Sequence, residues 1–326
     1  MASATPGLYT TVLTCPTFVF EPESILSCRN KFPTKRLPKI CRGEFDHMLS
    51  TLVRYQNQNI GLESFTMKAH IHEANMKQIC NRCVELATTG RKGLRSLTLS
   101  PDFGFNNTSV LPSSVFQVES LVELSLGSCT VLLEQHPSWP NLIRLSLRFM
   151  RFENLEAWIE KVIQGCPLIE AMKINDCLDI DDGRQHYFKV TNLEKLTQLN
   201  VFVYPGYSVE VGATPNLESL TCGTYTRELV YSWPDLCQPG YQNLKRLYLS
   251  NNLGINGNHS HDHDFSSMDW TQQFPQLEEL SIQDYTNLQR VNISSRSLRK
   301  IKLVGLIRLE EAYFMCLESQ FSSTST

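Results

Sequence analysis

Apolar residues recur along most of the chain in one short pattern, with leucine at the first, fourth and sixth positions and polar residues between them. The clear copies are Leu94–Leu99, Leu121–Leu126, Leu142–Leu147 and Leu244–Leu249. Alternate side chains of a β-strand point to the same face, so Leu97 and Leu99 are predicted to enter a core while Ser96 and Thr98 face outward. Each copy therefore predicts one short strand that is buried on one face.

Six further segments carry the pattern with another residue in a leucine position: 62–67, 169–174, 196–201, 217–222, 277–282 and 298–303. Most successive copies begin 21 or 27 residues apart, which is typical of leucine-rich repeats. An ordinary parallel α/β domain is the alternative, but a strand-helix-strand crossover needs roughly 30 residues or more. The spacing predicts an α/β leucine-rich-repeat solenoid, a right-handed horseshoe of about ten repeats with parallel strands on its concave face.

The remaining segments suggest how the chain is organised around these repeats. Residues 1–42 lack the pattern and contain several prolines, and we interpret them as an N-terminal segment. Helical periodicity over 44–56 and 73–87 predicts capping helices, which with the first repeat occupy residues 43–90. The repeats then fill residues 91–317, with a further helix over 153–164, and residues 318–326 are predicted to be a flexible tail.

Composition limits the compartment and the partners. The net charge of −3 gives the chain no overall electrostatic attraction to nucleic acid. No apolar stretch approaches the roughly 20 residues that a membrane helix needs. The N-terminus lacks the features of a secretory signal, and the 11 cysteines are scattered through the chain. We therefore expect reduced thiols, a cytoplasmic or nuclear location, and neither nucleic acid nor membrane as a partner.

Two groups of residues have side chains that could bind a metal ion: His259, His261 and His263 with Asp262 and Asp264, and His70 and His72 with Cys80 and Cys83. We interpret the first group as part of a solvated insertion. The second overlaps the helix predicted over 73–87, on whose apolar face free cysteines act as small hydrophobic residues. The motifs of nucleophilic, phosphate-binding and zinc enzymes are missing from the sequence. We predict no metal, no cofactor, no catalytic residue and no enzymatic activity.

The outward positions of the strands are the candidate binding surface for a target protein. Arg144 and Arg148 on one strand lie next to Lys173 on the following one, and such cations can bind an acidic or phosphorylated segment of a partner. The alternative is that they only keep the surface soluble. Arg246 and Tyr248 form a second candidate, because these residue types are frequent in interface hot spots.

Several segments resemble the plant F-box/leucine-rich-repeat family: Leu111–Phe116 with Ser120–Cys129, Gly165–Glu170 with Asn175–Cys177, and Pro215–Leu220. The resemblance extends from about residue 11 to about 317, and Thr14–Phe20 is similar to the segment that follows the family's F-box. It implies an N-terminal F-box that docks on a Skp1-like adaptor of an SCF-type ubiquitin ligase, with repeats that bind the protein to be ubiquitinated. The few residues before Thr11 are too short for that module, so we expect the F-box to be missing or truncated.

Three functions are compatible with this resemblance. The chain could be the substrate-recognition part of an E3 ubiquitin ligase, with the Skp1-like adaptor as partner only if an F-box lies upstream or is supplied in trans. It could instead be a freestanding binding protein that does not dock on the ligase. It could also be a small-ligand co-receptor, as in the more distant auxin and jasmonate receptors.

Overall fold

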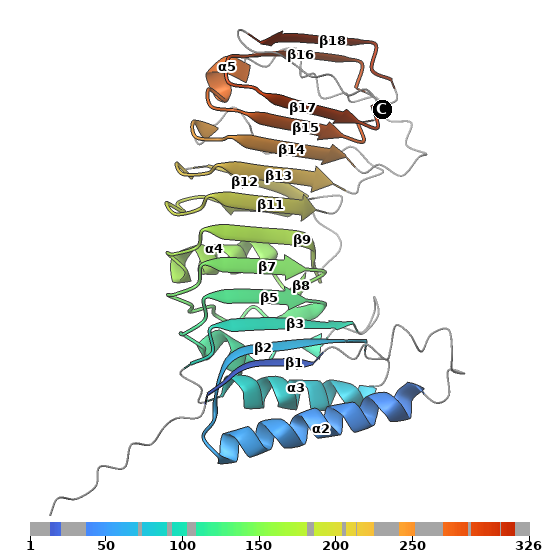
Figure 1. The fold of residues 1–326 in the computed structure, drawn as a ribbon, viewed down its shortest axis with the longest axis vertical. Helices are drawn as coiled ribbons and strands as arrows, with labels where there is room; N and C mark the ends of the chain where they lie inside the picture. Colours follow the sequence, from blue (N-terminus) through green and yellow to red (C-terminus); the bar gives the residue numbers. More distant parts are fainter. Residues whose placement is uncertain are drawn as a thin grey trace, which may run out of the picture.

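Each of the ten copies of the leucine pattern forms one strand of a long parallel sheet in the computed structural model (Figure 1). These strands are β2 (Gly61–His70), β3 (Ser96–Asp102), β5 (Glu123–Gly127), β7 (Arg144–Arg148), β9 (Ala171–Asp179), β11 (Gln198–Val203), β13 (Ser219–Thr224), β14 (Arg246–Asn251), β15 (Glu279–Gln283) and β17 (Lys300–Val304). They pair in this order, one above the other. The α/β leucine-rich-repeat fold predicted from the sequence is confirmed.

The structure describes residues 14–20, 37–70, 74–89, 93–102, 109–180, 186–203, 207–212, 214–224, 241–251, 270–285, 288–306 and 308–316. The histidine-containing insertion around 256–264 and the tail predicted over 318–326 lie outside these residues.

Strand register places the leucines of successive repeats in one continuous core. Leu97 pairs with Leu124, which pairs with Leu145 and then with Met172 of the next repeat. All four side chains are at most 2% exposed, as the alternation of the pattern predicts. The repeats therefore stabilise one another by burying the same row of side chains.

The sheet contains a strand that the leucine pattern does not predict. Within the segment interpreted as lying before the repeats, β1 (Thr14–Phe20) pairs in parallel with β2. Its Phe18 ring stacks on Phe65 at 5.7 Å between centroids, and Phe20 packs on Phe45 at 4.8 Å. Aromatic residues replace the leucines here, which explains why the pattern search missed this strand.

The segments that return from one strand to the next form a second layer behind the sheet (Figure 1). Helices lie there in only part of the described chain: α2 (Leu37–Asn57), α3 (Ala74–Thr88), α4 (Leu155–Gly165), the short α5 (Trp270–Gln273) and the 3-10 helix η1 (Ser113–Gln117). Elsewhere the layer consists of short parallel strands: β4 (Ser109–Val110), β6 (Cys129–Val131), β8 (Arg151–Phe152), β10 (His186–Val190), β12 (Tyr207–Val211), β16 (Arg290–Ser295) and β18 (Glu311–Cys316). Repeats of 21 residues leave too little length for a helix, so β6, β12 and β16 take its place.

The three longest helices agree with the periodicity of the sequence, although α2 begins at Leu37, earlier than predicted. Helix α4 is anchored at its N-terminal end by two side chains. The Oδ1 atom of Asn154 accepts a hydrogen bond from the backbone N–H of Ala157 at 2.8 Å, and Oδ1 of Asp179 on β9 accepts one from Leu155 at 2.6 Å. These bonds satisfy N–H groups that the first helical turn leaves free.

Polar side chains in the turns tie each repeat to the one before it. Asn141 donates a hydrogen bond to the carbonyl of Glu119 at 3.0 Å, and Asn216 donates one to the carbonyl of Glu194 at 2.6 Å. The fully buried Trp139 donates through Nε1 to the carbonyl of Val115 at 3.1 Å. The stack therefore combines apolar burial with hydrogen bonds between repeats.

Candidate functional site

A groove of about 410 Å³ crosses the outward face of six adjacent strands, from β3 to β13. We call this face of the main sheet, on the side away from the core, the strand face. The side chains that line the groove from outward positions are Ser96, Thr98, Glu123, Ser125, Arg144, Ser146, Ala171, Lys173, Gln198, Asn200, Ser219 and Thr221. Since neighbouring strands lie about 4.8 Å apart, the groove extends for roughly 24 Å across them.

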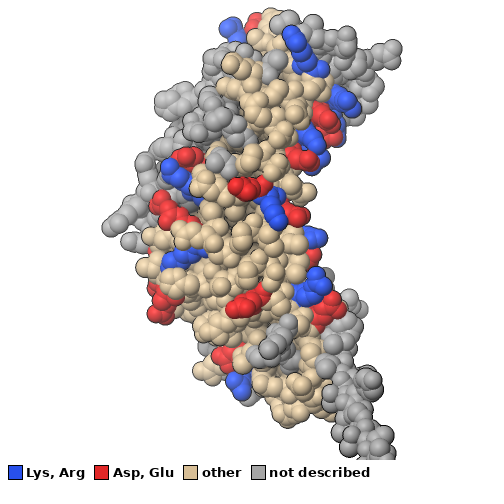
Figure 2. Space-filling view, turned by 90° about the vertical axis from the view of Figure 1, so that its left-hand side faces the viewer, with Lys and Arg blue, Asp and Glu red and all other residues tan. Residues whose placement is uncertain are grey.

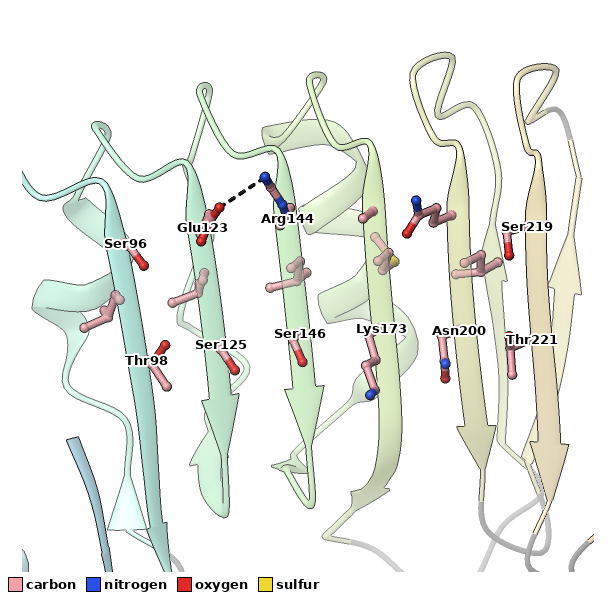
Figure 3. A pocket seen from close by; sticks show the side chains of 17 residues that line it. Ser96, Thr98, Glu123, Ser125, Arg144, Ser146, Lys173, Asn200, Ser219 and Thr221 are labelled. Carbon is pink, nitrogen blue, oxygen red and sulfur yellow. Dashed lines mark ion pairs between the residues drawn. The ribbon is translucent and has the colours of Figure 1, made fainter. Parts of the chain in front are cut away.

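The shape of the groove follows from the strand register. Thr98, Ser125 and Ser146 lie opposite one another on the neighbouring strands β3, β5 and β7, and we call such a row of paired residues a rung. The same rung continues through Lys173 and Asn200 (Figure 3). The short hydroxyl side chains leave space above the backbone, while the leucines between them point to the opposite face. The groove is therefore lined with hydroxyl and amide groups that can exchange hydrogen bonds with an extended chain.

The two cations in the groove differ in their surroundings. Arg144 Nη1 lies 3.0 Å from Glu123 Oε1, as the dashed line in Figure 3 shows, and both side chains are about half exposed. Lys173 points into the groove one rung away and makes no ion pair with any other described residue. Lys173 is consequently the cation that is available to a bound anionic group.

Two amide oxygens beside Lys173 lack a hydrogen-bond donor. Oδ1 of Asn200, on the same rung, and Oδ1 of Asn175, on β9, are buried and have no partner among the described residues. A buried acceptor without a donor costs free energy. A ligand N–H group would recover part of that cost only if the Asn200 side chain turned this buried oxygen toward the groove.

Arg148 lies outside the groove, although the sequence analysis grouped it with Arg144 and Lys173. Its guanidinium group lies over the ring of Phe149, 4.8 Å from the centroid. Burial raises the pKa of the Asp176 carboxyl, and the positive charge of Arg148 opposes this rise. The structure therefore brings together two members of the predicted trio.

Arg246 and Tyr248 also lie beyond the groove, on β14. The hydroxyl of Tyr248 donates to Oε2 of Glu279 at 2.9 Å. Burial raises the pKa of this tyrosine, and the hydrogen bond to Glu279 raises it further. Glu279 in turn lies 3.5 Å from Nζ of Lys300, so the second candidate pair belongs to a charged cluster next to the groove.

The sequence analysis missed three residues of the groove lining: Ala171, Ser219 and Thr221. Ser219 and Thr221 fill the polar positions of the copy at 217–222, so applying the same alternation to that degenerate copy would have predicted them. Ala171 has no polar atom in its side chain, and it widens the groove between Arg144 and Gln198 by being small.

The interpretation of Cys80 and Cys83 as apolar core residues is confirmed. Both lie on α3 and are at most 2% exposed. Burial raises the pKa of both thiols, that of Cys83 to about 12, which favours the protonated form over the thiolate that metal binding requires. The described residues contain no cluster of three or more metal-binding side chains.

Charges of both signs are mixed on the side of the molecule seen in Figure 2, which shows no extended patch of a single sign among the described residues. No helix in the described part of the chain combines the length and apolar character that crossing a membrane requires.

Comparison with known proteins identifies the repeats. Residues 84–229 match the family model "FBD-associated F-box protein At5g56370, LRR repeats". The putative F-box/FBD/LRR-repeat protein At5g25850 of Arabidopsis thaliana is 33% identical over 89 residues, which cover 27% of this chain and 18% of that relative. The similarity thus spans less than a fifth of the relative's length.

The fold and the polar groove define a leucine-rich-repeat protein-interaction module. Over the matched residues, its repeats are similar to those of F-box/leucine-rich-repeat proteins, including one of Arabidopsis thaliana.

Proposed function

We propose that the groove between β3 and β13 binds a target protein, and that the chain is the substrate-recognition part of an SCF-type E3 ubiquitin ligase in the cytoplasm or the nucleus. The observation that supports target binding best is the groove itself, because six consecutive repeats contribute to it and five of them place a serine, threonine or asparagine there. The ligase role is supported by the F-box proteins whose repeats this chain resembles.

The groove favours an extended segment of a protein over a small molecule. It lies open along the strand face and draws its lining from six strands, whereas small-molecule sites are mostly enclosed and apolar. A chain lying across the strands would meet hydroxyl groups at Ser125 and Ser146. A carboxylate or phosphate of this segment would pair with Lys173.

A substitution that fills the groove tests this proposal. Ser146→Arg places a long side chain in the middle of the groove, and we expect it to prevent target binding, because Ser146 is only partly buried and its replacement can remain solvated. Tagged wild-type chain and variant are incubated with plant extract, and the proteins retained by each are compared by mass spectrometry. Glu160→Arg on α4, which is exposed behind the sheet, serves as the matched control.

Targets of the groove are the proteins retained by the wild-type chain and by Glu160→Arg but lost with Ser146→Arg. Identical retention by all three chains would contradict binding in the groove. The ligase role is read from the same samples: a Skp1-like adaptor retained with the target, and ubiquitination of that target when the cullin complex is added, are expected. Retention of the target by a folded chain without adaptor or ubiquitination would instead identify a freestanding binding protein.

A further inference from the structure

The charged side chains of the groove are few and unevenly placed. One rung consists of Thr98, Ser125, Ser146, Lys173, Asn200 and Thr221. Lys173 carries the only charge on this rung, and its side chain points into the groove (Figure 3). The whole lining contains two cations, Arg144 and Lys173, and one anion, Glu123, which gives a net charge of +1. Since Arg144 and Glu123 pair at 3.0 Å, the excess positive charge is that of Lys173.

Lys173 lies off the centre of the groove. Its strand, β9, is three strands from β3 and two strands from β13, which at a strand spacing of about 4.8 Å places it about 14 Å and about 10 Å from the two ends. An extended chain rises about 3.4 Å per residue, so about eight residues span the groove. Their alternate side chains face the sheet about 7 Å apart. When one of them faces Lys173, the next toward β3 lies between β5 and β7, close to Glu123 and Arg144.

A carboxylate matches the surroundings of Lys173 better than a phosphate does. It brings one negative charge, which one lysine balances, and its oxygens can accept a hydrogen bond from the hydroxyl of Ser146, opposite Lys173 on β7. A phosphorylated side chain carries a charge of about −1.5 to −2 at neutral pH. A phosphate at this position therefore needs a second cation.

The two arginines nearest to Lys173 along the chain of β7 are engaged elsewhere. Arg144 pairs with Glu123, and its transfer to a phosphate would leave that carboxylate unpaired beside the phosphate. Arg148 directs its guanidinium group over the ring of Phe149 and does not line the groove. Glu123 thus disfavours a ligand with more than one negative charge, a repulsive contribution to specificity.

We infer that the groove selects an extended, unphosphorylated segment of about eight residues in which a single aspartate or glutamate faces Lys173. This inference rests on the target binding proposed above and names the chemistry of the segment. The residue that lies close to Glu123 and Arg144 is uncharged, since a charge of either sign would meet a like charge there. Phosphorylation in place of the carboxylate weakens capture of the target.

Four libraries of biotinylated nine-residue peptides test this inference. Each library has one fixed central residue, which is glutamate, phosphoserine, serine or lysine, and randomised residues on both sides, so that either direction of the chain is sampled. The full chain is incubated with each library, and the retained peptide is quantified. We expect the glutamate library to be retained about threefold or more above each of the other three, because only its central charge matches that of Lys173.

Charge reversal at Lys173 tests which residue carries the selectivity. Lys173→Glu should lower retention of the glutamate library by about fivefold or more and raise that of the lysine library, because the attraction becomes a repulsion. Lys195→Glu is the matched control, since it makes the same change in charge at an exposed position in the turn before β11, and it should keep the wild-type preference. Glu123→Gln should raise retention of the phosphoserine library.

The outcomes separate this inference from target binding in the groove. Retention of the phosphoserine library at or above the level of the glutamate library, or equal retention of all four libraries, would overturn the preference for a carboxylate. The same result would follow from equal effects of Lys173→Glu and Lys195→Glu. In each of these cases, loss of peptide binding with Ser146→Arg would still support the groove as the binding site. Retention that Ser146→Arg leaves unchanged would contradict binding in the groove itself.

Discussion

Arg144 and Lys173 face the same groove, yet their charges are available to a different degree. Arg144 lies 3.0 Å from Glu123, and this exposed pair leaves little net charge at that end of the groove. Lys173 has no ion-pair partner among the described residues and lies beside the unpaired Oδ1 of Asn200. At the scale of single residues, Lys173 is thus the stronger candidate for contact with an anionic group.

Lys173→Ala is therefore predicted to weaken binding of a groove target by about fivefold to tenfold, and Arg144→Ala by less. Isothermal titration calorimetry with a captured target would measure both. Glu123→Gln is the informative companion, because removing the carboxylate frees Arg144 and should strengthen binding of an acidic target. Equal affinity of all three variants and the wild-type chain would remove these side chains from the interface.

The elements of the second layer depend on close contacts between repeats, and α4 provides the clearest case. This helix ends at Gly165, where an added Cβ atom would lie 2.5 Å from the carbonyl oxygen of Pro137 in the preceding repeat. Two backbones approach each other here, so the absence of a side chain is required by packing. From the sequence alone, this glycine indicates only that a helix ends here.

Gly165→Ala is accordingly predicted to lower the free energy of unfolding by about 1 to 3 kcal/mol through overpacking. Gly43→Ala in α2 is the matched control, because nothing lies within 4 Å of its added Cβ. Alanine in a helix is more favourable than glycine by about 0.5 to 1 kcal/mol, so the control should be stabilised. Urea unfolding followed by circular dichroism measures both, and a stabilised Gly165→Ala would contradict the contact with Pro137.

At the scale of the whole molecule, the solenoid is a series of units in contact with their immediate neighbours. Strands in the middle, such as β7 and β9, are covered on both sides, and their core residues Leu147 and Ile174 are fully buried. The last strand, β17, has a neighbour on one side only among the described residues. In such stacks local stability depends on how many neighbours a repeat has.

Hydrogen exchange is predicted to follow this gradient. Amides of β7 and β9 should be the most protected, and those of β17 and β18 should exchange faster, because fewer contacts oppose their opening. Mass spectrometry of exchanged peptides would measure the order. Uniform protection from β7 to β18 would show that the described repeats open as a single unit.

The repeated part of the fold could be predicted almost completely from the sequence. The ten copies of the pattern correspond to ten strands in the predicted order, since burying leucine at alternate positions allows one orientation of each strand. The first strand was missed because Phe18 and Phe20 replace leucine. The three helices predicted from periodicity correspond to α2, α3 and α4, whereas the short strands of the second layer were not predicted.

The candidate groove could be predicted only in part. Outward positions on the strands were correctly placed, including Arg144 and Lys173. Arg246 and Tyr248 lie outside the groove because it ends at β13, one strand before theirs. Arg148 lies outside it with its guanidinium group over the ring of Phe149. Such contacts join residues through the fold and through rotamers, which a pattern of residue types does not specify.

The sequence by itself determined the repeat, its strands and the face on which each polar residue lies, because strand alternation and leucine burial are local consequences of residue order. Only the tertiary structure decided which of these residues form a groove and which cations are already paired. The groove and the ion pairs depend on the stacking of neighbouring repeats. Register brings Ser125, Ser146 and Lys173 onto one rung, although they belong to three separate copies of the pattern.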